Sequence, residues 1–271
     1  MDFSLFKKIV DEIARYKGTG IIPFFRGESL LHPDFISMIS YANSKGIKPI
    51  QLATNASLLD DSKSDAIFRL GIDFISFSLD GVNEDIYKKV RPGCDYSRVI
   101  ANINNFLNKR KRRNRMFPQV QVSLVETAVT KETIPKFVHY WLKRVDRVRI
   151  YKEHSNRGKF GNIRSSGNIF KKRLACLKPM TETAIYWNGE VAICNHDWMR
   201  KDPMGNISKE SLRSIWKNKK YAALRKLHFA GNADLDDTCK DCSHWMSYYL
   251  PEGLIGRLYK RADYVRNSRD S

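Results

Sequence analysis

The sequence has no long apolar run and no export signal. A membrane-spanning helix requires about 18–20 apolar residues in succession, and no segment of the 271 residues approaches that length. The N-terminal segment 1–16 also lacks the continuous apolar core of a signal peptide, because acidic residues interrupt it. We therefore expect a cytoplasmic protein without a membrane span.

Acidic residues are scarce relative to basic ones. The chain has 48 lysines and arginines but only 29 aspartates and glutamates, so its formal net charge is +19. Such a charge attracts anions, including nucleic acid and acidic membranes. The densest basic run is 109–115, and we expect it to be a solvated helix end and loop. A nucleic-acid patch is the less favoured alternative, because no recognisable nucleic-acid-binding module accompanies the run.

Cysteines are few, and four of the five lie in the C-terminal part of the chain. Cytosolic thiols stay reduced, so clustered cysteines favour a metal site over disulfides. Cys239 and Cys242 form a C-x2-C pair, and this spacing lets both sulfurs face one metal from a single turn. Cys94 stands alone beside a Pro-Gly pair, and we interpret it as an ordinary loop thiol.

Residues 1–155 alternate between helical and strand periodicity. The predicted helices are near 5–13, 35–46, 60–70, 97–112 and 131–143, and the predicted strands are 20–25, 48–54, 74–80, 120–126 and 147–152. This alternation requires parallel strands joined by right-handed helical crossovers. We therefore predict an α/β fold, either a partial (β/α) barrel or an open doubly wound sheet. The pattern begins with a helix, so the usual first strand is absent.

Polar residues follow several of the predicted strands. In both kinds of parallel sheet, ligands bind at the carboxyl ends of the strands. The strand-end residues that we consider as candidate ligand-binding residues are Gly27, Glu28, Thr54, Asn55, Ser78, Asp80 and Glu126. Strand-end capping and turn formation are the alternative explanation for part of this set.

The pattern changes after the predicted fifth strand. Segment 156–175 is polar and reads as a linker or a loop, segment 176–250 as a small α+β domain rich in cysteine, and segment 251–271 as a basic tail with a surface helix. Within the small domain, we expect Ser208 to cap a helix that runs through Leu224.

Asn188 and Gly189 separate two short alternating runs, which predicts a β-hairpin with a two-residue turn. That turn would place Thr183 opposite Cys194 and bring Cys176 within loop reach of Cys194. With the C-x2-C pair, four thiols then converge on one tetrahedral or cuboidal metal site. Zinc and a [4Fe–4S] cluster both accept four thiolates, so the spacing does not separate them.

Two histidines close to these cysteines in the sequence, His196 and His244, can in principle replace a thiol as a ligand. We expect ordinary packing or surface placement for both. The predicted metal ligands are therefore Cys176, Cys194, Cys239 and Cys242.

Four motifs in this order resemble the radical S-adenosylmethionine (SAM) enzymes that carry a C-terminal SPASM-type iron–sulfur domain. They are "RGESLLHPD", "LATNASLLD", "FISFSLDG" followed by "YKKVRPG", and the C-terminal set "CLKPMTETAIYWNGEVAICNHD", "MGNISKESLRSIW" and "CKDC". Each motif alone is weak, but their order and spacing together are specific. The resemblance implies a partial radical SAM barrel over 1–155 and a SPASM-like domain over 176–250.

The resemblance also implies roles for individual positions. The corner at Gly27 and Glu28 would offer backbone carbonyls to the ammonium group of SAM. Thr54 and Asn55 would face the same pocket, and Ser78 and Asp80 would contact the methionine or ribose part of SAM. The four C-terminal cysteines would hold an auxiliary [4Fe–4S] cluster, which the family favours over zinc.

Two departures from the family pattern bear on activity. Arg26 stands where the family has a glycine, and its side chain either crowds the ligand or points away. The family's C-x3-C-x2-C loop, which binds the SAM-cleaving cluster, is missing from the sequence. We therefore expect a truncated version of a radical SAM enzyme, in preference to a natural degenerate relative, that does not cleave SAM as it stands. No catalytic residue is assigned.

The expected function follows from this resemblance. The enzyme would use a SAM-derived radical to abstract hydrogen from a peptide, a sugar or a small metabolite, with an auxiliary cluster and an electron-donor protein. The alternative is a non-catalytic four-cysteine zinc or iron–sulfur module that recruits an acidic partner or nucleic acid.

Overall fold

The computed structural model describes residues 1–153, 170, 172–197, 200, 202–240, 242–249 and 256–263. The chain forms two compact units, one of Met1–Arg15 with Glu153–Ile255 and the other of Tyr16–Lys152 with Gly256–Ser271. We call them the cysteine unit and the sheet unit and describe each by itself. Among the described residues, no helix is both long enough and apolar enough to cross a membrane.

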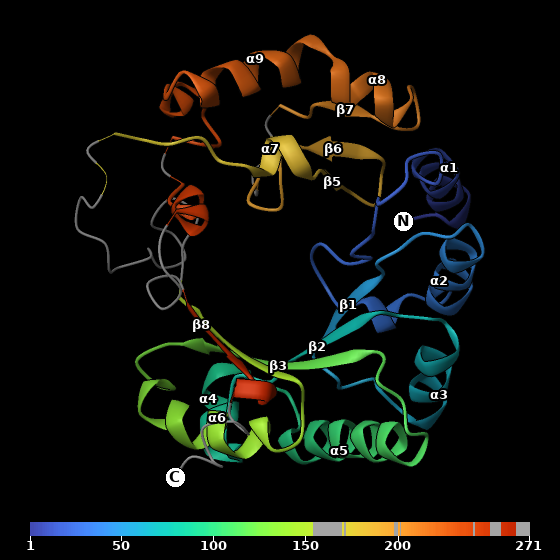
Figure 1. The fold of residues 1–271 in the computed structure, drawn as a ribbon, viewed down its shortest axis with the longest axis vertical. Helices are drawn as coiled ribbons and strands as arrows, with labels where there is room; N and C mark the ends of the chain where they lie inside the picture. Colours follow the sequence, from blue (N-terminus) through green and yellow to red (C-terminus); the bar gives the residue numbers. More distant parts are fainter. Residues whose placement is uncertain are drawn as a thin grey trace. The chain divides into compact units, whose positions relative to one another are not determined.

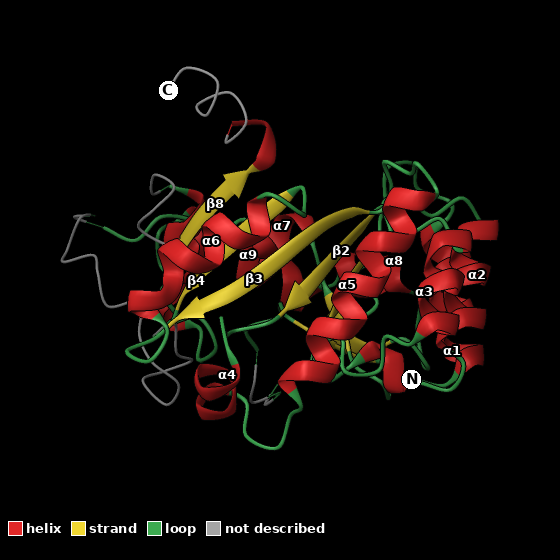
Figure 2. Ribbon diagram, turned by 90° about the horizontal axis from the view of Figure 1, so that it is seen from below, coloured by secondary structure: helices red, strands yellow, loops and turns green. Residues whose placement is uncertain are grey.

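The sheet unit contains a five-stranded sheet with the order β1-β2-β3-β4-β8. Four neighbouring strands are parallel, and β8 runs antiparallel to β4 at the edge. The strands are β1 (Gln51–Thr54), β2 (Phe74–Ser78), β3 (Gln119–Glu126), β4 (Arg147–Lys152) and β8 (Gly256–Lys260). The long strand β3 lies between β2 and β4 (Figure 2).

Helices connect the parallel strands and lie along the outer side of the curved sheet (Figure 1). They are α2 (Phe35–Ser44), α3 (Asp61–Arg69), α4 (Glu84–Val90), α5 (Tyr96–Arg112) and α6 (Ile134–Leu142). This arrangement confirms the predicted α/β fold and decides for the partial (β/α) barrel over an open sheet with helices on both faces.

The two faces of the central strands differ in chemistry because side chains alternate along a strand. On the helix side, Phe77 is fully buried and packs edge-on against Phe106 of α5, with ring centroids 5.5 Å apart. On the opposite face, Gln121 donates a hydrogen bond to Ser76 across β2 and β3, at 3.0 Å. The predicted strand at 120–126 therefore reads as alternating, not continuously apolar.

The predicted strand at 20–25 is wrong in extent. Only Ile21 pairs with the sheet, through an isolated parallel bridge to Ile50. Pro23 has no N–H to donate to a ladder, and the neighbouring Ile22 and Phe24 are exposed. The chain therefore leaves the sheet early and enters the corner that follows in a non-strand conformation.

Three further differences concern local structure in the sheet unit. The helix α4 is absent from our prediction, although Asn83 caps it by accepting a hydrogen bond from the Ile86 amide. The predicted helix at 131–143 begins as a 3-10 turn, Lys131–Thr133, before α6. In the basic tail, where a surface helix was expected, Gly256–Lys260 forms the edge strand β8.

The cysteine unit holds a three-stranded antiparallel sheet of order β5-β6-β7 and several helices. Its elements are α1 (Phe3–Ile13), α7 (Lys178–Thr181), β5 (Ala184–Ile185), β6 (Glu190–Ala192), β7 (Gly205–Asn206), α8 (Leu212–Lys217), α9 (Lys219–Phe229) and two 3-10 helices, η3 (Ala233–Leu235) and η4 (His244–Tyr248). The linker expected at 156–175 falls mostly outside the described residues.

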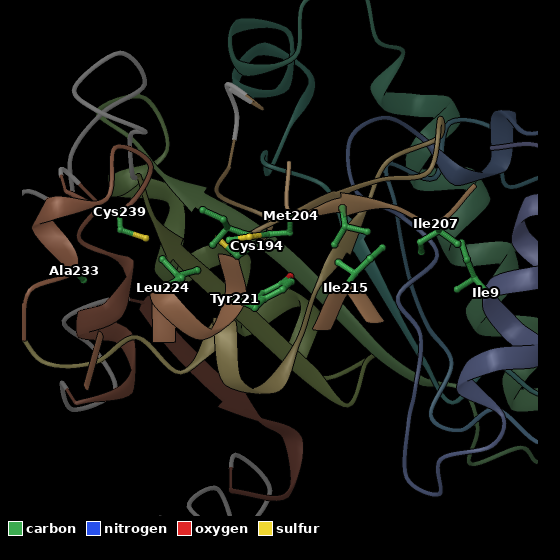
Figure 3. Close-up of a cluster of buried hydrophobic side chains, with 11 residues drawn as sticks. Ile9, Cys194, Met204, Ile207, Ile215, Tyr221, Leu224, Ala233 and Cys239 are labelled. Carbon is green, nitrogen blue, oxygen red and sulfur yellow. The ribbon is translucent and has the colours of Figure 1, made fainter. Parts of the chain in front are cut away.

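A buried cluster organises this unit (Figure 3). Cys194 and Cys239 belong to it, together with Ile215 from α8, Tyr221 from α9 and Ile9 from α1. Our boundary grouped α1 with the sheet, whereas the contacts group it with the cysteine unit. Two hydrogen bonds support that grouping, because the Glu12 carboxylate accepts from the backbone amides of residues 212 and 213, at 2.8 and 2.7 Å.

The hairpin between β5 and β6 forms as predicted, but its register is shifted. Tyr186 pairs with Glu190 around a three-residue loop, 187–189, in which Gly189 has φ +85°. A left-handed third residue is the usual way to close such a loop. The predicted opposition of Thr183 and Cys194 is therefore wrong by one residue.

The helix cap predicted at Ser208 is also misplaced. Ser211 caps α8 by accepting a hydrogen bond from the Ser214 amide, at 3.0 Å. The expected continuous helix is in fact two, because Asn218 leaves the helical conformation and caps α9 by accepting from the Tyr221 amide.

Candidate functional site

All four C-terminal cysteines line one pocket of the cysteine unit. Cys176 precedes α7, Cys194 follows β6, and Cys239 and Cys242 lie on one turn before η4. The other lining residues are Arg173, Lys178, Pro179, Ile193, His196, His228, Thr238, His244 and Trp245. The structure thus brings the predicted ligands together from three separate segments, while Cys94 lies in the sheet unit.

The C-x2-C turn is formed by local hydrogen bonds. The Asp236 carboxylate accepts from the Thr238 and Cys239 amides, at 2.9 and 3.0 Å, and the Cys242 amide donates to the Cys239 carbonyl at 3.0 Å. Aspartate commonly forms such side-chain turns, which replace the backbone's own hydrogen bonds. Hydrogen bonds between residues that are close in the sequence therefore shape this turn.

Arg173 secures the same turn from a distant segment. Its guanidinium donates to the carbonyls of Cys239, Lys240 and Cys242, at 2.7, 3.1 and 3.4 Å. It also forms an ion pair with Asp234, and its side chain is only 9% exposed. A planar group with several donors can bind several carbonyls at once, which a lysine cannot do in the same way.

His228 on α9 lies between two of the cysteine segments. Its Nδ1 atom is 3.2 Å from the amide nitrogen of Cys176, and its Nε2 atom is 3.6 Å from Sγ of Cys239. The residue is only 1% exposed. A buried imidazole with both nitrogens engaged holds its neighbours in one relative position.

Burial dominates the acid–base behaviour of the four thiols. It raises the pKa of Cys194 to about 12 and also raises the pKa of Cys176, Cys239 and Cys242 above the usual thiol value. Without a bound cation these cysteines are therefore protonated at neutral pH. A metal that binds them must release their protons, because the thiolate is the ligand.

Two basic residues, Arg173 and Lys178, line the pocket beside the thiols. Lys178 is 8% exposed and forms an ion pair with Glu182. Four thiolates leave a bound zinc ion or iron–sulfur cubane with net negative charge, and nearby cations offset the cost of burying it. The electrostatics of the pocket therefore suit an anionic metal–thiolate centre.

His196 and His244, the two histidines considered as alternative ligands, both line the pocket. Their rings lie close together, with centroids 4.1 Å apart and an angle of 35° between the ring planes. Within the described part of the chain, no group of three or more His, Cys, Asp or Glu side chains has the geometry to hold a single metal ion.

In the sheet unit, the corner at Gly27 and Glu28 is tied to the end of β1. The Glu28 carboxylate accepts from the Thr54 hydroxyl at 2.7 Å, from the Asn55 amide at 2.8 Å and from the Leu30 amide at 3.1 Å. Gly27 has φ +112°, and nothing lies within 4 Å of the position that a Cβ would occupy. The carboxylate thus positions the corner and leaves space beside its backbone.

Arg26 and Ser29 flank this corner. The guanidinium of Arg26 lies over the ring of Phe25, 4.7 Å from its centroid, and the hydroxyl of Ser29 donates to the Pro23 carbonyl at 2.8 Å. The side chain of Arg26 is therefore held against its neighbour. Arg26, which stands where the family has a glycine, and Ser29 therefore both have local roles in shaping the corner.

Asp80 is committed to contacts within the sheet unit. One carboxylate oxygen accepts from Nε and Nη2 of Arg91, at 3.0 and 2.6 Å, and the other accepts from the Val125 amide at 2.7 Å. Asp80 has φ +53° and is 6% exposed. Ser78 ends β2 opposite Ser123 of β3 and is half-buried. The carboxylate of Asp80 therefore braces this strand end.

Glu126, the remaining strand-end candidate, is also engaged. Its carboxylate pairs with Lys152 at 2.7 Å and with Arg257 at 3.4 Å. It links the ends of β3, β4 and β8 by charge.

Sequence reasoning missed the three basic residues Arg173, Lys178 and His228 among those that line the cysteine pocket. His228 and Cys176 are 52 positions apart, and Arg173 and Cys239 are 66 positions apart. No local pattern links such pairs. Lys178 directly follows Cys176 and Leu177, so the sequence did offer one signal, a basic residue close to a predicted metal ligand.

Two family profiles match this chain. The profile of the radical SAM superfamily matches residues 1–137, and that of the SPASM family, described as an iron–sulfur cluster-binding domain, matches residues 176–243. The second match contains all four cysteines that line the pocket. The family description favours an iron–sulfur group over zinc.

Among characterised proteins, the chain is similar to the tungsten-containing aldehyde ferredoxin oxidoreductase cofactor-modifying protein of Pyrococcus furiosus. The two are 24% identical over 90% of this chain and 79% of that protein. The fold is also similar to that of BtrN in complex with AdoMet and 2-DOIA, with a TM-score of 0.58 at 19% identity over 90% of this chain and 80% of BtrN.

A second similar structure is SuiB of Streptococcus suis bound to the precursor peptide SuiA. Its TM-score is 0.64 at 14% identity, over 83% of this chain and 60% of SuiB. These two structural similarities establish the fold alone. Because the superfamily profile covers more than half of the chain, this protein belongs to the radical SAM superfamily, whose enzymes cleave SAM to abstract hydrogen, and it carries a SPASM-type iron–sulfur domain.

Proposed function

We propose that the cysteine unit binds one auxiliary [4Fe–4S] cluster through Cys176, Cys194, Cys239 and Cys242. The observation that carries the proposal is that four thiols from three separate segments line a single pocket. Four cysteine thiolates are the usual ligands of this cluster. Four cysteine ligands would leave no iron of this cluster open to a substrate, so the cluster would supply electron transfer.

The SPASM profile supports a cluster over a zinc ion, because it describes an iron–sulfur domain and matches the segment that contains the four cysteines. Two basic side chains, Arg173 and Lys178, would offset the negative charge that four thiolates bring to either kind of centre.

We propose further that the sheet unit binds SAM at the carboxyl ends of its strands. The backbone carbonyls of Gly27 and Glu28 would accept hydrogen bonds from the ammonium group of SAM, in the space beside Gly27. Thr54 and Asn55 hold that corner through the Glu28 carboxylate. Ser78 lies at a neighbouring strand end and would contact the methionine or ribose part, with Asp80 bracing the strand behind it.

The reaction that fits is hydrogen abstraction from an organic substrate, with the auxiliary cluster accepting or passing electrons. The sequence contains no C-x3-C-x2-C motif. We therefore assign to these residues the binding of SAM and of the auxiliary cluster, and no step of SAM cleavage. The substrate would be a small metabolite or a peptide, as in the BtrN and SuiB complexes, and the net charge of +19 suits an acidic electron-donor protein.

Anaerobic reconstitution tests the cluster proposal. The wild-type protein should bind about four irons and four sulfides per chain and absorb broadly near ~400 nm. Cys194→Ser and Cys239→Ser should lose most of this iron, whereas the matched control Cys94→Ser should keep it, because Cys94 lies in the sheet unit. Stoichiometric zinc without iron, or equal iron loss in all three variants, would overturn the proposal.

Equilibrium dialysis with labelled SAM tests the second proposal. Gly27→Ala should weaken binding several-fold, because an alanine at φ +112° is strained and its Cβ enters the space beside the corner. Gly46→Ala is the control, since Gly46 also has a positive φ and open space around it, but it follows α2 and precedes β1, away from the carboxyl ends of the strands. Equal affinities of the two variants would contradict the assignment of SAM to this corner.

A further inference from the structure

The buried imidazole of His228 connects two of the four cysteine ligands. Its Nδ1 atom is 3.2 Å from the backbone nitrogen of Cys176, and its Nε2 atom is 3.6 Å from Sγ of Cys239. The two cysteines lie on opposite sides of α9 in the sequence, and the histidine projects from that helix. One side chain thus contacts the backbone of one ligand and the sulfur of another.

The first contact determines which ring nitrogen carries the proton. A backbone N–H can only donate, so Nδ1 of His228 must accept from Cys176 and carries no hydrogen. The proton of the imidazole is therefore on Nε2, the atom that faces Sγ of Cys239. Sulfur is larger than oxygen, so 3.6 Å is within reach of an N–H···S hydrogen bond.

We propose that His228 donates an N–H···S hydrogen bond to Cys239 and thereby raises the reduction potential of the auxiliary cluster. This inference rests on the proposed function, in which Cys239 is a cluster ligand. Reduction adds negative charge to the cluster and its thiolates, so a hydrogen-bond donor to sulfur stabilises the reduced state more than the oxidised state. Hydrogen bonds to the sulfurs are among the factors that set iron–sulfur potentials.

The other contacts to the cysteine segments differ in kind. Sγ of Cys194 accepts from the backbone amide of His196 at 3.3 Å, and any substitution other than proline leaves that donor in place. Arg173 donates to backbone carbonyls of the C-x2-C turn. His228 is a positioning residue whose side chain itself offers a donor to a ligand sulfur. Substitution of His228 therefore tests this donor without removing the contacts made by His196 and Arg173.

Two variants separate the hydrogen bond from packing. His228→Leu removes both ring nitrogens at similar volume, and His228→Gln keeps an N–H group near the position of Nε2. In a potentiometric titration followed by electron paramagnetic resonance, His228→Leu should have a more negative potential than the wild type, and His228→Gln should lie closer to the wild type. His139→Leu, on the exposed side of α6, is the control and should match the wild type.

An unchanged potential in iron-loaded His228→Leu overturns the inference and leaves the cluster proposal intact. A wild-type protein that binds no iron fails the cluster proposal itself, so the two failures are distinguishable. If His228→Leu loses its cluster, the wild type and His228→Gln, each labelled with 15N only in the imidazole rings of histidine, are compared in the reduced state by pulsed electron paramagnetic resonance. A coupling to an imidazole nitrogen that is present in the wild type and absent from His228→Gln supports the bond, and identical couplings in the two proteins overturn it.

Discussion

The ion pair between Asp80 and Arg91 is the contact in the sheet unit whose strength can be tested most directly. Two hydrogen bonds join the groups, at 3.0 and 2.6 Å, and the other oxygen of Asp80 accepts from the Val125 amide at 2.7 Å. The side chain of Asp80 is 9% exposed and that of Arg91 is 26% exposed. The carboxylate thus joins the end of β2 to β3 and to the segment after α4.

The magnitude follows from this burial. Breaking a fully buried ion pair by removing one partner costs about 3–5 kcal/mol, and partial exposure of Arg91 lowers the expected cost to about 2 kcal/mol. Asp80→Asn isolates this loss, because the remaining amide oxygen can still accept from Val125. Asp80→Ala removes that acceptor as well and should cost about 1 kcal/mol more.

The assay is a double-mutant cycle with Asp80→Asn, Arg91→Met and the double variant, measured by urea unfolding of the reconstituted protein. The coupling energy should be about 2 kcal/mol. The exposed pair of Glu84 and Lys88 on α4 is the control, and Glu84→Gln should change the free energy of unfolding by less than about 0.5 kcal/mol. Additive effects at Asp80 and Arg91 would refute the role of this ion pair in stability. The expectation that Asp80 contacts SAM directly would then be the better account of this residue.

Two other contacts yield predictions of the same kind. Arg173→Met removes the donors to the C-x2-C turn and should destabilise the cluster-free protein by about 3 kcal/mol in calorimetry, whereas Asp234→Asn should have little effect; equal effects would contradict the role of those donors. The hydrogen bond from Lys109 lowers the pKa of Asp65, with a smaller contribution from Arg113. A lowered pKa stabilises the fold above the unfolded-state pKa, so the melting-temperature difference between wild type and Lys109→Met should be largest near pH 7 and shrink as the pH falls below about 4; a difference independent of pH would contradict this account.

Local patterns predicted the sheet unit well where short-range forces decide the structure. The strands at 74–80, 120–126 and 147–152 and the helix at 97–112 were expected within a few residues, because their apolar periodicity matches the face they bury. The same reasoning failed at 20–25, where Pro23 withholds a donor and exposed apolar side chains mislead. It also failed in the basic tail, since pairing with β4 and not local propensity makes 256–260 a strand.

The hairpin shows how a small local difference changes a site prediction. The Asn-Gly signal predicted a turn at the correct place, yet the loop also includes Trp187 and is closed by Gly189 in the left-handed region, which shifts the register by one. The expected opposition of Thr183 and Cys194 was therefore wrong. Cys194 nevertheless reaches the pocket, because the chain turns after β6.

The sequence by itself determined the family, the ligand-type residues and the strand-end corner. These are properties of residue identity and short spacing, such as the C-x2-C pair and the Gly-Glu corner, and they hold whatever surrounds them. Only the tertiary structure decided what supports these residues. Arg173 and His228 contact cysteine residues that are more than 50 positions away in the sequence. Asp80, at the end of β2, contacts Val125 of the neighbouring strand β3. Hydrogen bonds and charge pairs act over a few ångströms in space, and the fold alone determines which distant residues come within that range.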